Sequence, residues 1–138
     1  DGRLLSGGQM RRASLAIGIA LDPGILLLDE PTANLDIATR KEIMRTLEQM
    51  KEITETVVIA THDMQLVCEW AERVVVLSGG RVLADGPRDR IFADRALLDA
   101  AGIRPPEIFT MGRALDPQTV CYTVEEFLHE FTGRKAEG

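Results

Sequence analysis

The pattern of apolar and polar positions predicts three short buried strands separated by helices. Residues 25–28 form an apolar run without polar alternation, and similar runs follow at 57–60 and 74–77. Such runs are typical of parallel strands that helices cover on both faces. Between the first two runs, apolar residues recur at helical spacing, at Ile43, Met44, Leu47, Met50 and Ile53. The pattern therefore predicts an α/β fold with a parallel sheet.

Residues that start and stop helices set the limits of the other elements. Ser6 to Gln9 has capping-box spacing, and Asp22-Pro23 ends the first helix, predicted over about Met10 to Leu21. Asp36 and Asp63 are expected to cap the second and third helices. Beyond the strand at 74–77 we expect a hairpin that turns at Gly79-Gly80 and runs to residue 84. A helix over 88–101 and a linker over 102–106 should follow. We then expect a short helix to about 115 and a last helix that starts after a capping box at 123–126.

The end of the first strand carries the first candidate chemistry. Asp29 and Glu30 follow the apolar run directly, and Pro31 then ends the strand because it has no N–H to donate. Ligands of open α/β sheets bind at the carboxyl ends of the strands. The alternative is a strand whose last two residues simply reach solvent, and these residues alone do not decide between the two. His62 follows the strand at 57–60, and this position at a strand end favours a functional histidine over a structural one.

The motifs around this strand, in their order and spacing, resemble the second half of an ABC-type ATPase. The signature loop corresponds to Leu5, Ser6, Gly7, Gly8 and Gln9, the Walker B strand to Ile25 through Asp29, the catalytic glutamate to Glu30, the D-loop to Ala33, Asn34, Leu35 and Asp36, and the switch histidine to His62. The resemblance covers about residues 1–86 and implies the three-layer α/β fold of P-loop NTPases with a parallel sheet. We expect residues 1–86 to be the C-terminal part of an ATPase domain and residues 87–138 to be a helical extension.

The same resemblance implies ATP and Mg²⁺ as cofactors. Asp29 would bind Mg²⁺ through water, which suits the reluctance of this ion to lose its waters. Glu30 would orient or deprotonate the attacking water, and His62 would contact the γ-phosphate or hold the water and Glu30 in register. The signature loop would act in trans, on nucleotide bound by the facing subunit, and Asp36 would link the two sites.

Two features depart from the family pattern. Asn34 stands where glycine is usual in the D-loop, and Ile37 where proline is frequent, but neither change removes a chemical group. The sequence also contains no G-x-x-x-x-G-K-[ST] motif, because neither Gly7-Gly8 nor Gly79-Gly80 leads to Lys-Ser/Thr. We therefore expect a C-terminal portion of an ATPase that is inactive alone and whose sheet lacks the Walker A strand, between 57–60 and 74–77.

The segment Leu97 to Pro106 resembles the helical extension of ATPases from energy-coupling-factor importers, which take up B vitamins and ions such as cobalt and nickel. In that family the extension helps two ATPase subunits to associate. The resemblance implies a second ATPase subunit, arranged head to tail, and a transmembrane transporter subunit as partners. It also implies a peripheral position on the cytoplasmic face of the cell membrane.

Composition narrows the alternatives. The net charge of −6 gives no support for nucleic-acid binding, which needs clustered Lys and Arg. Cys68 and Cys121 have no neighbouring ligand residues and are expected to be reduced and not to bind metal. The apolar runs are too short to span a membrane. The alternatives are an ABC ATPase subunit of another importer class and a soluble ABC ATPase of DNA repair, whose usual coiled coils and zinc modules this chain lacks. A further hypothesis is a non-catalytic interaction fragment.

Overall fold

The computed structural model describes residues 7–133, which form two compact units that meet at Asp63 and Met64. The first unit contains two strands and two helices, and the second contains a hairpin and five short helices.

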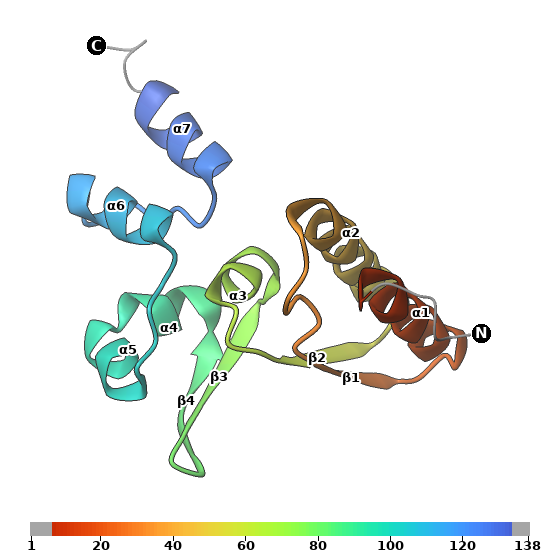
Figure 1. Ribbon diagram of the computed structural model, residues 1–138. Helices are drawn as coiled ribbons and strands as arrows, with labels where there is room; N and C mark the ends of the chain where they lie inside the picture. Colours follow the sequence, from red (N-terminus) through yellow and green to blue (C-terminus); the bar gives the residue numbers. More distant parts are fainter. Residues whose placement is uncertain (1–6, 134–138) are drawn as a thin grey trace. The chain divides into compact units, whose positions relative to one another are not determined.

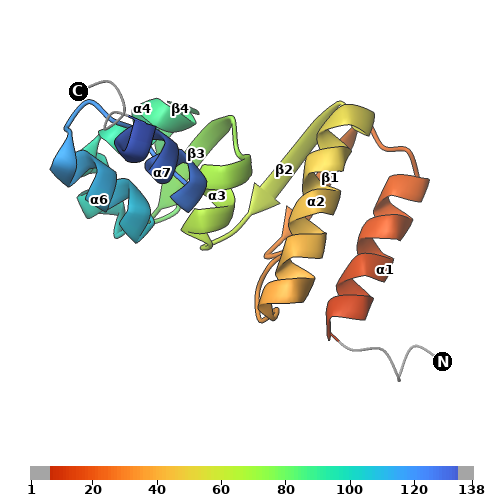
Figure 2. The same cartoon turned by 90° about the horizontal axis from the view of Figure 1, so that it is seen from above.

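The first unit is a pair of parallel strands covered by two helices. Its elements are α1 (Gly7–Ala20), β1 (Ile25–Asp29), α2 (Ile37–Ile53) and β2 (Thr56–Ala60). The two strands run in register from the pair Ile25 and Thr56 to the pair Asp29 and Ala60. Both helices lie on the same side of the strands, as Figures 1 and 2 show. The predicted apolar stripe of α2 is confirmed at Ile43, Leu47 and Met50, which are fully buried, but not at Ile53, which is 58% exposed.

The strands of this unit are buried on one face only. Leu26 and Leu28 face the helices and are half-buried, whereas Ile25 and Leu27 are 64% and 73% exposed. On β2, Val58 lies on the same open face as Leu27, directly opposite it in the register. The prediction of burial on both faces is therefore wrong for the described residues, because α1 and α2 supply a single covering layer.

The second unit begins with α3 (Met64–Trp70) and an antiparallel hairpin of β3 (Arg73–Ser78) and β4 (Arg81–Pro87). Gly79 and Gly80 form its turn with φ angles of 56° and 72°, which confirms the predicted glycine turn. The strands β2 and β3 lie in separate sheets and do not pair with each other. The place of a further strand between them stays a prediction.

Four helices follow the hairpin: α4 (Arg88–Ala93), α5 (Arg95–Ala101), α6 (Glu107–Leu115) and α7 (Val124–Gly133). The prediction of one helix over 88–101 is wrong, because the helix is interrupted at Asp94. The Asp94 carboxylate accepts a hydrogen bond from the Leu97 N–H at 3.0 Å and so starts a new helix. The capping box at 123–126 is confirmed: the Glu126 N–H donates to Thr123 Oγ1 at 3.1 Å, and the Glu126 carboxylate accepts from the Tyr122 N–H.

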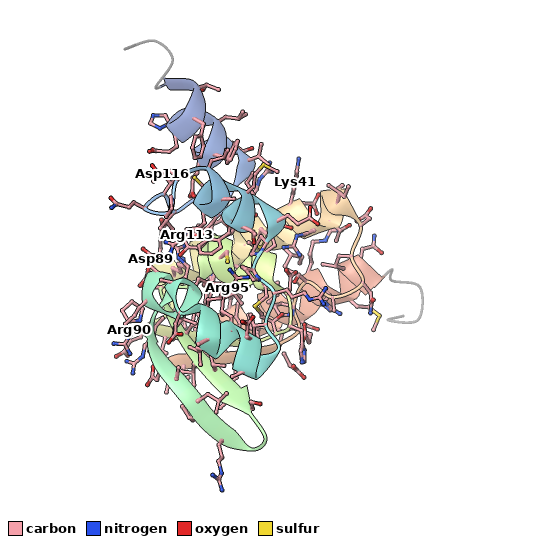
Figure 3. All side chains as sticks on the ribbon, turned by 90° about the vertical axis from the view of Figure 1, so that its left-hand side faces the viewer. Lys41, Asp89, Arg90, Arg95, Arg113 and Asp116 are labelled. Atoms are coloured by element: carbon pink, nitrogen blue, oxygen red, sulfur yellow. The ribbon has the colours of Figure 1, made fainter. Side chains whose placement is uncertain are left out.

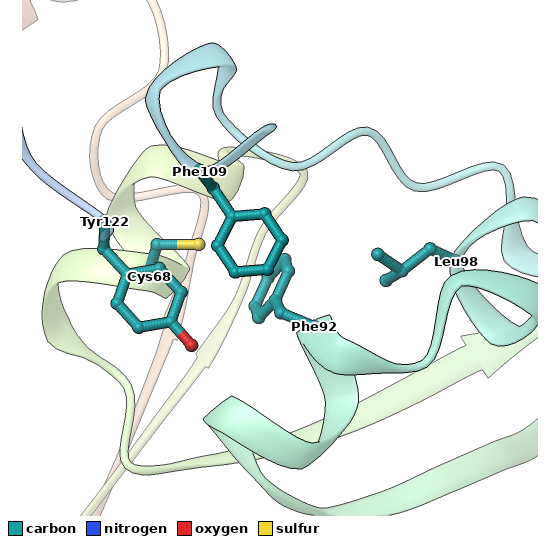
Figure 4. Close-up of a cluster of buried hydrophobic side chains, with 5 residues drawn as sticks. All are labelled: Cys68, Phe92, Leu98, Phe109 and Tyr122. Carbon is teal, nitrogen blue, oxygen red and sulfur yellow. The ribbon is translucent and has the colours of Figure 1, made fainter. Parts of the chain in front are cut away.

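An aromatic cluster forms the core of the second unit (Figure 4). It contains the buried residues Cys68, Phe92, Leu98, Phe109 and Tyr122, which come from α3, α4, α5, α6 and the segment before α7. The Tyr122 ring stacks on Phe109 with 5.5 Å between centroids. Its hydroxyl donates to Asp89 at 2.6 Å, and the Arg88 guanidinium lies over its face. The predicted domain boundary after residue 86 stays a prediction, and this core contains residues from both sides of it.

Both cysteines are free thiols in buried positions, and burial raises the pKa of Cys68 to about 12. Charged side chains of both signs lie on α4 to α6, and among them Asp89, Arg90, Arg95 and Arg113 are labelled in Figure 3. Within residues 7–133, no helix combines the length and apolar character that a membrane crossing requires.

Candidate functional site

Glu30 is fixed through its backbone at the carboxyl end of β1. Its N–H donates to the Ala60 carbonyl at 2.8 Å and so continues the parallel ladder by one residue. Its φ angle is 46°, in the left-handed region, which costs a non-glycine residue about 1–2 kcal/mol. Its carbonyl accepts hydrogen bonds from Arg11 Nη1 at 2.8 Å and from the Ala33 N–H at 3.3 Å.

The Glu30 carboxylate is held by the residues that follow β2. The Thr61 hydroxyl donates to Oε2 at 2.9 Å, and the His62 N–H donates to Oε1 at 2.9 Å. His62 Nδ1 lies 2.7 Å from the same oxygen and, when it carries the hydrogen, donates a hydrogen bond to it. The hydrogen bond from the His62 ring is the main reason why the pKa of Glu30 lies below its ordinary value. The structure thus brings Glu30 and His62 together, and Glu30 is kept ionised.

Removal of the His62 ring is expected to raise the pKa of Glu30. In His62→Ala the carboxylate loses its strongest stabilising hydrogen bond, so its pKa should move back towards the ordinary value of 4.5. Because the folded pKa is depressed, Glu30 stabilises the fold above its unfolded pKa, and that contribution is lost as pH falls through the folded pKa. Carbon-detected NMR titration of the carboxyl groups measures the shift.

Asp85 is the internal control for this titration. Its pKa is also lowered, by hydrogen bonds from Arg73 in the second unit, and it should titrate identically in both proteins. A Glu30 pKa that is unchanged in His62→Ala would contradict the proposed coupling between the two side chains.

Asp29 ends β1 with its side chain exposed, next to Ala60 in the register. Among residues 7–133, no three His, Cys, Asp or Glu side chains lie close enough together to hold a metal ion. A nucleotide-bound magnesium ion takes much of its coordination from phosphate oxygens and waters. One accessible carboxylate suits this arrangement, since Mg²⁺ in nucleotide sites is bound by one or two carboxylates together with phosphates and waters.

The predicted signature residues are only partly described, because Leu5 and Ser6 lie outside residues 7–133. Gly7, Gly8 and Gln9 form the first turn of α1, so this helix begins three residues earlier than predicted. A Cβ at Gly7 would meet nothing within 4 Å, whereas a Cβ at Gly8 would lie 2.5 Å from Thr39 Cγ2 of α2. Gly8 therefore allows α1 to approach α2 closely, and substitutions there disturb packing within the chain itself. Gly7 is the better probe of the signature loop.

The predicted D-loop connects β1 to α2. Asp36 caps α2, because its carboxylate accepts a hydrogen bond from the Thr39 N–H at 3.0 Å, and this bond lowers the pKa of Asp36. Leu35 is half-buried. Asn34 has a φ angle of 58°, which explains why asparagine replaces the usual glycine: asparagine tolerates the left-handed region better than other side chains.

Three further contacts were not predicted from the sequence. Thr32 is buried and donates to Asp63 at 2.7 Å, while the Arg40 guanidinium pairs with both oxygens of the same carboxylate. Asp63 thereby ties the loop after β1 and helix α2 to the segment that carries His62. The third contact is from Arg11 to Glu30. Thr32 and Asp63 adjoin Pro31 and His62, which is a weak signal, but Arg11 and Arg40 look like solvated helix charges in the sequence.

A family model described as "AAA domain, putative AbiEii toxin, Type IV TA system" matches residues 4–68. The cobalt import ATP-binding protein CbiO of Rhodobacter capsulatus is 42% identical over 108 residues, covering 78% of this chain and 39% of that protein. The energy-coupling factor transporter ATP-binding protein EcfA2 of Streptococcus sanguinis is 39% identical over 128 residues, covering 89% of this chain and 46% of that protein.

Solved structures agree with these relatives. CbiO1 from Clostridium perfringens, part of the ABC transporter complex CbiONQ, superposes with a TM-score of 0.57 at 39% identity, over 76% of this chain and 42% of that chain. The ATP-binding cassette MJ0796, solved as a dimer in a post-hydrolysis state with ADP and Pi, gives a TM-score of 0.53 at 38% identity, over 60% and 36% of the two chains.

The fold is therefore that of an ABC ATPase nucleotide-binding domain, which confirms the predicted P-loop NTPase class. The chain belongs to the family of ABC transporter ATP-binding proteins, and it is similar to the energy-coupling-factor ATPases within that family. It spans less than half the length of these relatives.

Proposed function

We propose that this protein is the ATP-hydrolysing subunit of a membrane importer of the energy-coupling-factor type. The observation that carries the proposal is the carboxylate of Glu30, which Thr61 and His62 hold ionised at the carboxyl ends of two parallel strands. The similarity to CbiO and EcfA2 proteins supports the transport class.

ATP with Mg²⁺ would supply the phosphoryl group and the cation that neutralises its charge. Asp29, exposed at the strand end, would bind the metal through water. Glu30 would accept a proton from the attacking water, a role for which its carboxylate must be ionised. His62, whose ring is fully exposed beyond Glu30, would hold Glu30 in register and face the γ-phosphate.

The signature loop and the D-loop would complete this chemistry across a dimer. Ser6, together with Gly7 and Gly8 at the N-terminus of α1, would contact the phosphate of nucleotide on the facing subunit. Asp36 would link the two sites across that interface. We further propose a transmembrane subunit as partner and a peripheral position on the cytoplasmic face of the membrane, and we expect the 138 residues alone to be inactive.

Placement of two inactivating changes in a dimer tests this proposal. The probes are Gly7→Val, at a position with open space around it, and Glu30→Gln. If the signature loop acts in trans, the two changes in different subunits both fall in one composite site and leave the other site intact. The same two changes in one subunit would damage both sites.

The measurement is ATP turnover of covalently linked dimers of the complete ATPase. Changes in different subunits should leave about half of the unmodified turnover, whereas changes in one subunit should lower it by about 10² or more. The reverse order would show that the loop acts in cis. Absence of ATP hydrolysis in the unmodified dimer would exclude the proposed function itself.

A further inference from the structure

Arg11 joins the helix that starts at the signature loop to the backbone of Glu30. It lies in the second turn of α1, after Gly7 to Gln9, and its Nη1 is 2.8 Å from the Glu30 carbonyl oxygen. The side chain is partly buried, so water competes less with this bond than with one on the open surface. A guanidinium donor also makes the bond charge-assisted, and such hydrogen bonds are roughly twice as strong as neutral ones.

The carbonyl that Arg11 contacts belongs to a residue in an unfavourable backbone conformation. Glu30 has a φ angle of 46°, and such a conformation persists only where its surroundings over-determine it. The N–H of Glu30 is fixed by its bond to the Ala60 carbonyl, and the carbonyl of Glu30 is fixed by Arg11 and the Ala33 N–H. Without Arg11, the carbonyl would keep only the 3.3 Å bond from the Ala33 N–H.

We infer that Arg11 is a positioning residue for Glu30, and that it couples contact at the signature loop of one subunit to the catalytic geometry of that same subunit. The inference rests on the proposed function. In that function Gly7 to Gln9 contact nucleotide on the facing subunit, whereas Glu30 acts on nucleotide of its own subunit. If α1 moves when the signature loop contacts nucleotide, the Arg11 side chain would transmit that displacement to Glu30.

The neighbouring Arg12 is a matched control. It lies one position further along α1 and carries the same charge, but it pairs with Glu42 at 2.7 Å on the surface, where both side chains are about half exposed. Exposed pairs of this kind contribute little to stability. Arg12 therefore holds a surface carboxylate, whereas Arg11 holds the Glu30 carbonyl.

The first experiment compares Arg11→Met with Arg12→Met in the complete ATPase. Methionine keeps much of the apolar stem and removes every donor. For Arg11→Met we expect kcat to fall about 10-fold with KM for ATP changed less than about 2-fold, because misplacement of a reacting group on the order of 1 Å can cost up to about 10² in rate. Arg12→Met should keep near-normal turnover, and Arg11→Lys should recover part of the loss.

A double substitution shows whether Arg11 acts through Glu30. In Glu30→Gln the base is absent, so adding Arg11→Met should lower turnover no further. A multiplied loss in the double variant would overturn the inference, and so would equal turnover in Arg11→Met and Arg12→Met. If Glu30→Gln alone keeps near-normal turnover, the proposed function fails at Glu30, whatever Arg11 does.

Amide hydrogen exchange supplies a readout that is independent of turnover. The Glu30 amide donates to the Ala60 carbonyl, and the Ala33 amide donates to the Glu30 carbonyl. Both amides should exchange faster in Arg11→Met, whereas their exchange rates should be unchanged in Arg12→Met. Amides in the centre of α2 should be unaffected in both, which distinguishes loss of local positioning from general unfolding. Unchanged exchange at Glu30 and Ala33 in Arg11→Met would overturn the inference.

Discussion

Replacement of Glu30 by glutamine is expected to lower ATP turnover of the complete ATPase by about 10² or more while nucleotide binding is retained. Glutamine has nearly the same shape: its amide oxygen can still accept from the His62 N–H, and its NH₂ group can donate to Thr61 Oγ1, where the carboxylate accepts both bonds at 2.9 Å on its two oxygens. It cannot accept a proton from water at neutral pH, so only the chemical step is lost. Steady-state turnover and equilibrium binding of a fluorescent ATP analogue measure the two effects separately.

Glu52→Gln is the control for this experiment, because Glu52 is an exposed carboxylate near the end of α2. It removes the same charge and should leave turnover unchanged. Near-normal turnover in Glu30→Gln would remove Glu30 from the catalytic role, and loss of nucleotide binding would show that the side chain holds the site together instead.

The second large effect is on stability. Leu47 is fully buried where α2 faces the sheet, between the equally buried Ile43 and Met50. Leu47→Ala removes buried methyl groups and leaves a cavity, which typically costs about 2–5 kcal/mol in free energy of unfolding. Urea denaturation followed by circular dichroism measures the change, and a shift in the midpoint at constant slope identifies lost stability.

Leu27→Ala is the matched control, since the same side chain is shortened at a position that is 73% exposed on the open face of β1. We expect a change within about 0.5 kcal/mol there. A cost at Leu47 no larger than that at Leu27 would contradict the placement of the core between α2 and the strands.

Much of the candidate site could be predicted because its signals are local. An apolar run, two carboxylates and a proline place Asp29 and Glu30 at a strand end, and a second run places His62. Parallel strands bring their carboxyl ends to one edge, so the Glu30–His62 contact follows from the order of elements. The glycine turn of the hairpin and the Thr123 cap depend likewise on adjacent residues, which explains why both predictions are confirmed.

The missed features depend on contacts between distant segments. The Gly8–Thr39 approach, the Arg11–Glu30 bond and the pairing of Arg40 with Asp63 each join residues about 19 to 31 positions apart. No periodicity encodes such partners, and an arginine on a helix looks the same whether it meets solvent or a carbonyl. The wrong prediction of strand burial has a related cause. An apolar run shows that both faces of a strand can be buried, but other parts of the molecule determine which faces are covered.

The left-handed conformation of Glu30 sets stability against chemistry at one position. A requirement of the fold alone would place glycine or asparagine there, as happens at Asn34, which has a similar φ angle. Glu30→Gly would relieve the backbone strain and at the same time remove the candidate base. A mutational scan that measures folding yield should therefore favour glycine at position 30, whereas a scan that measures transport should favour glutamate. Such a disagreement would show that glutamate is retained there for its chemistry and not for the stability of the fold.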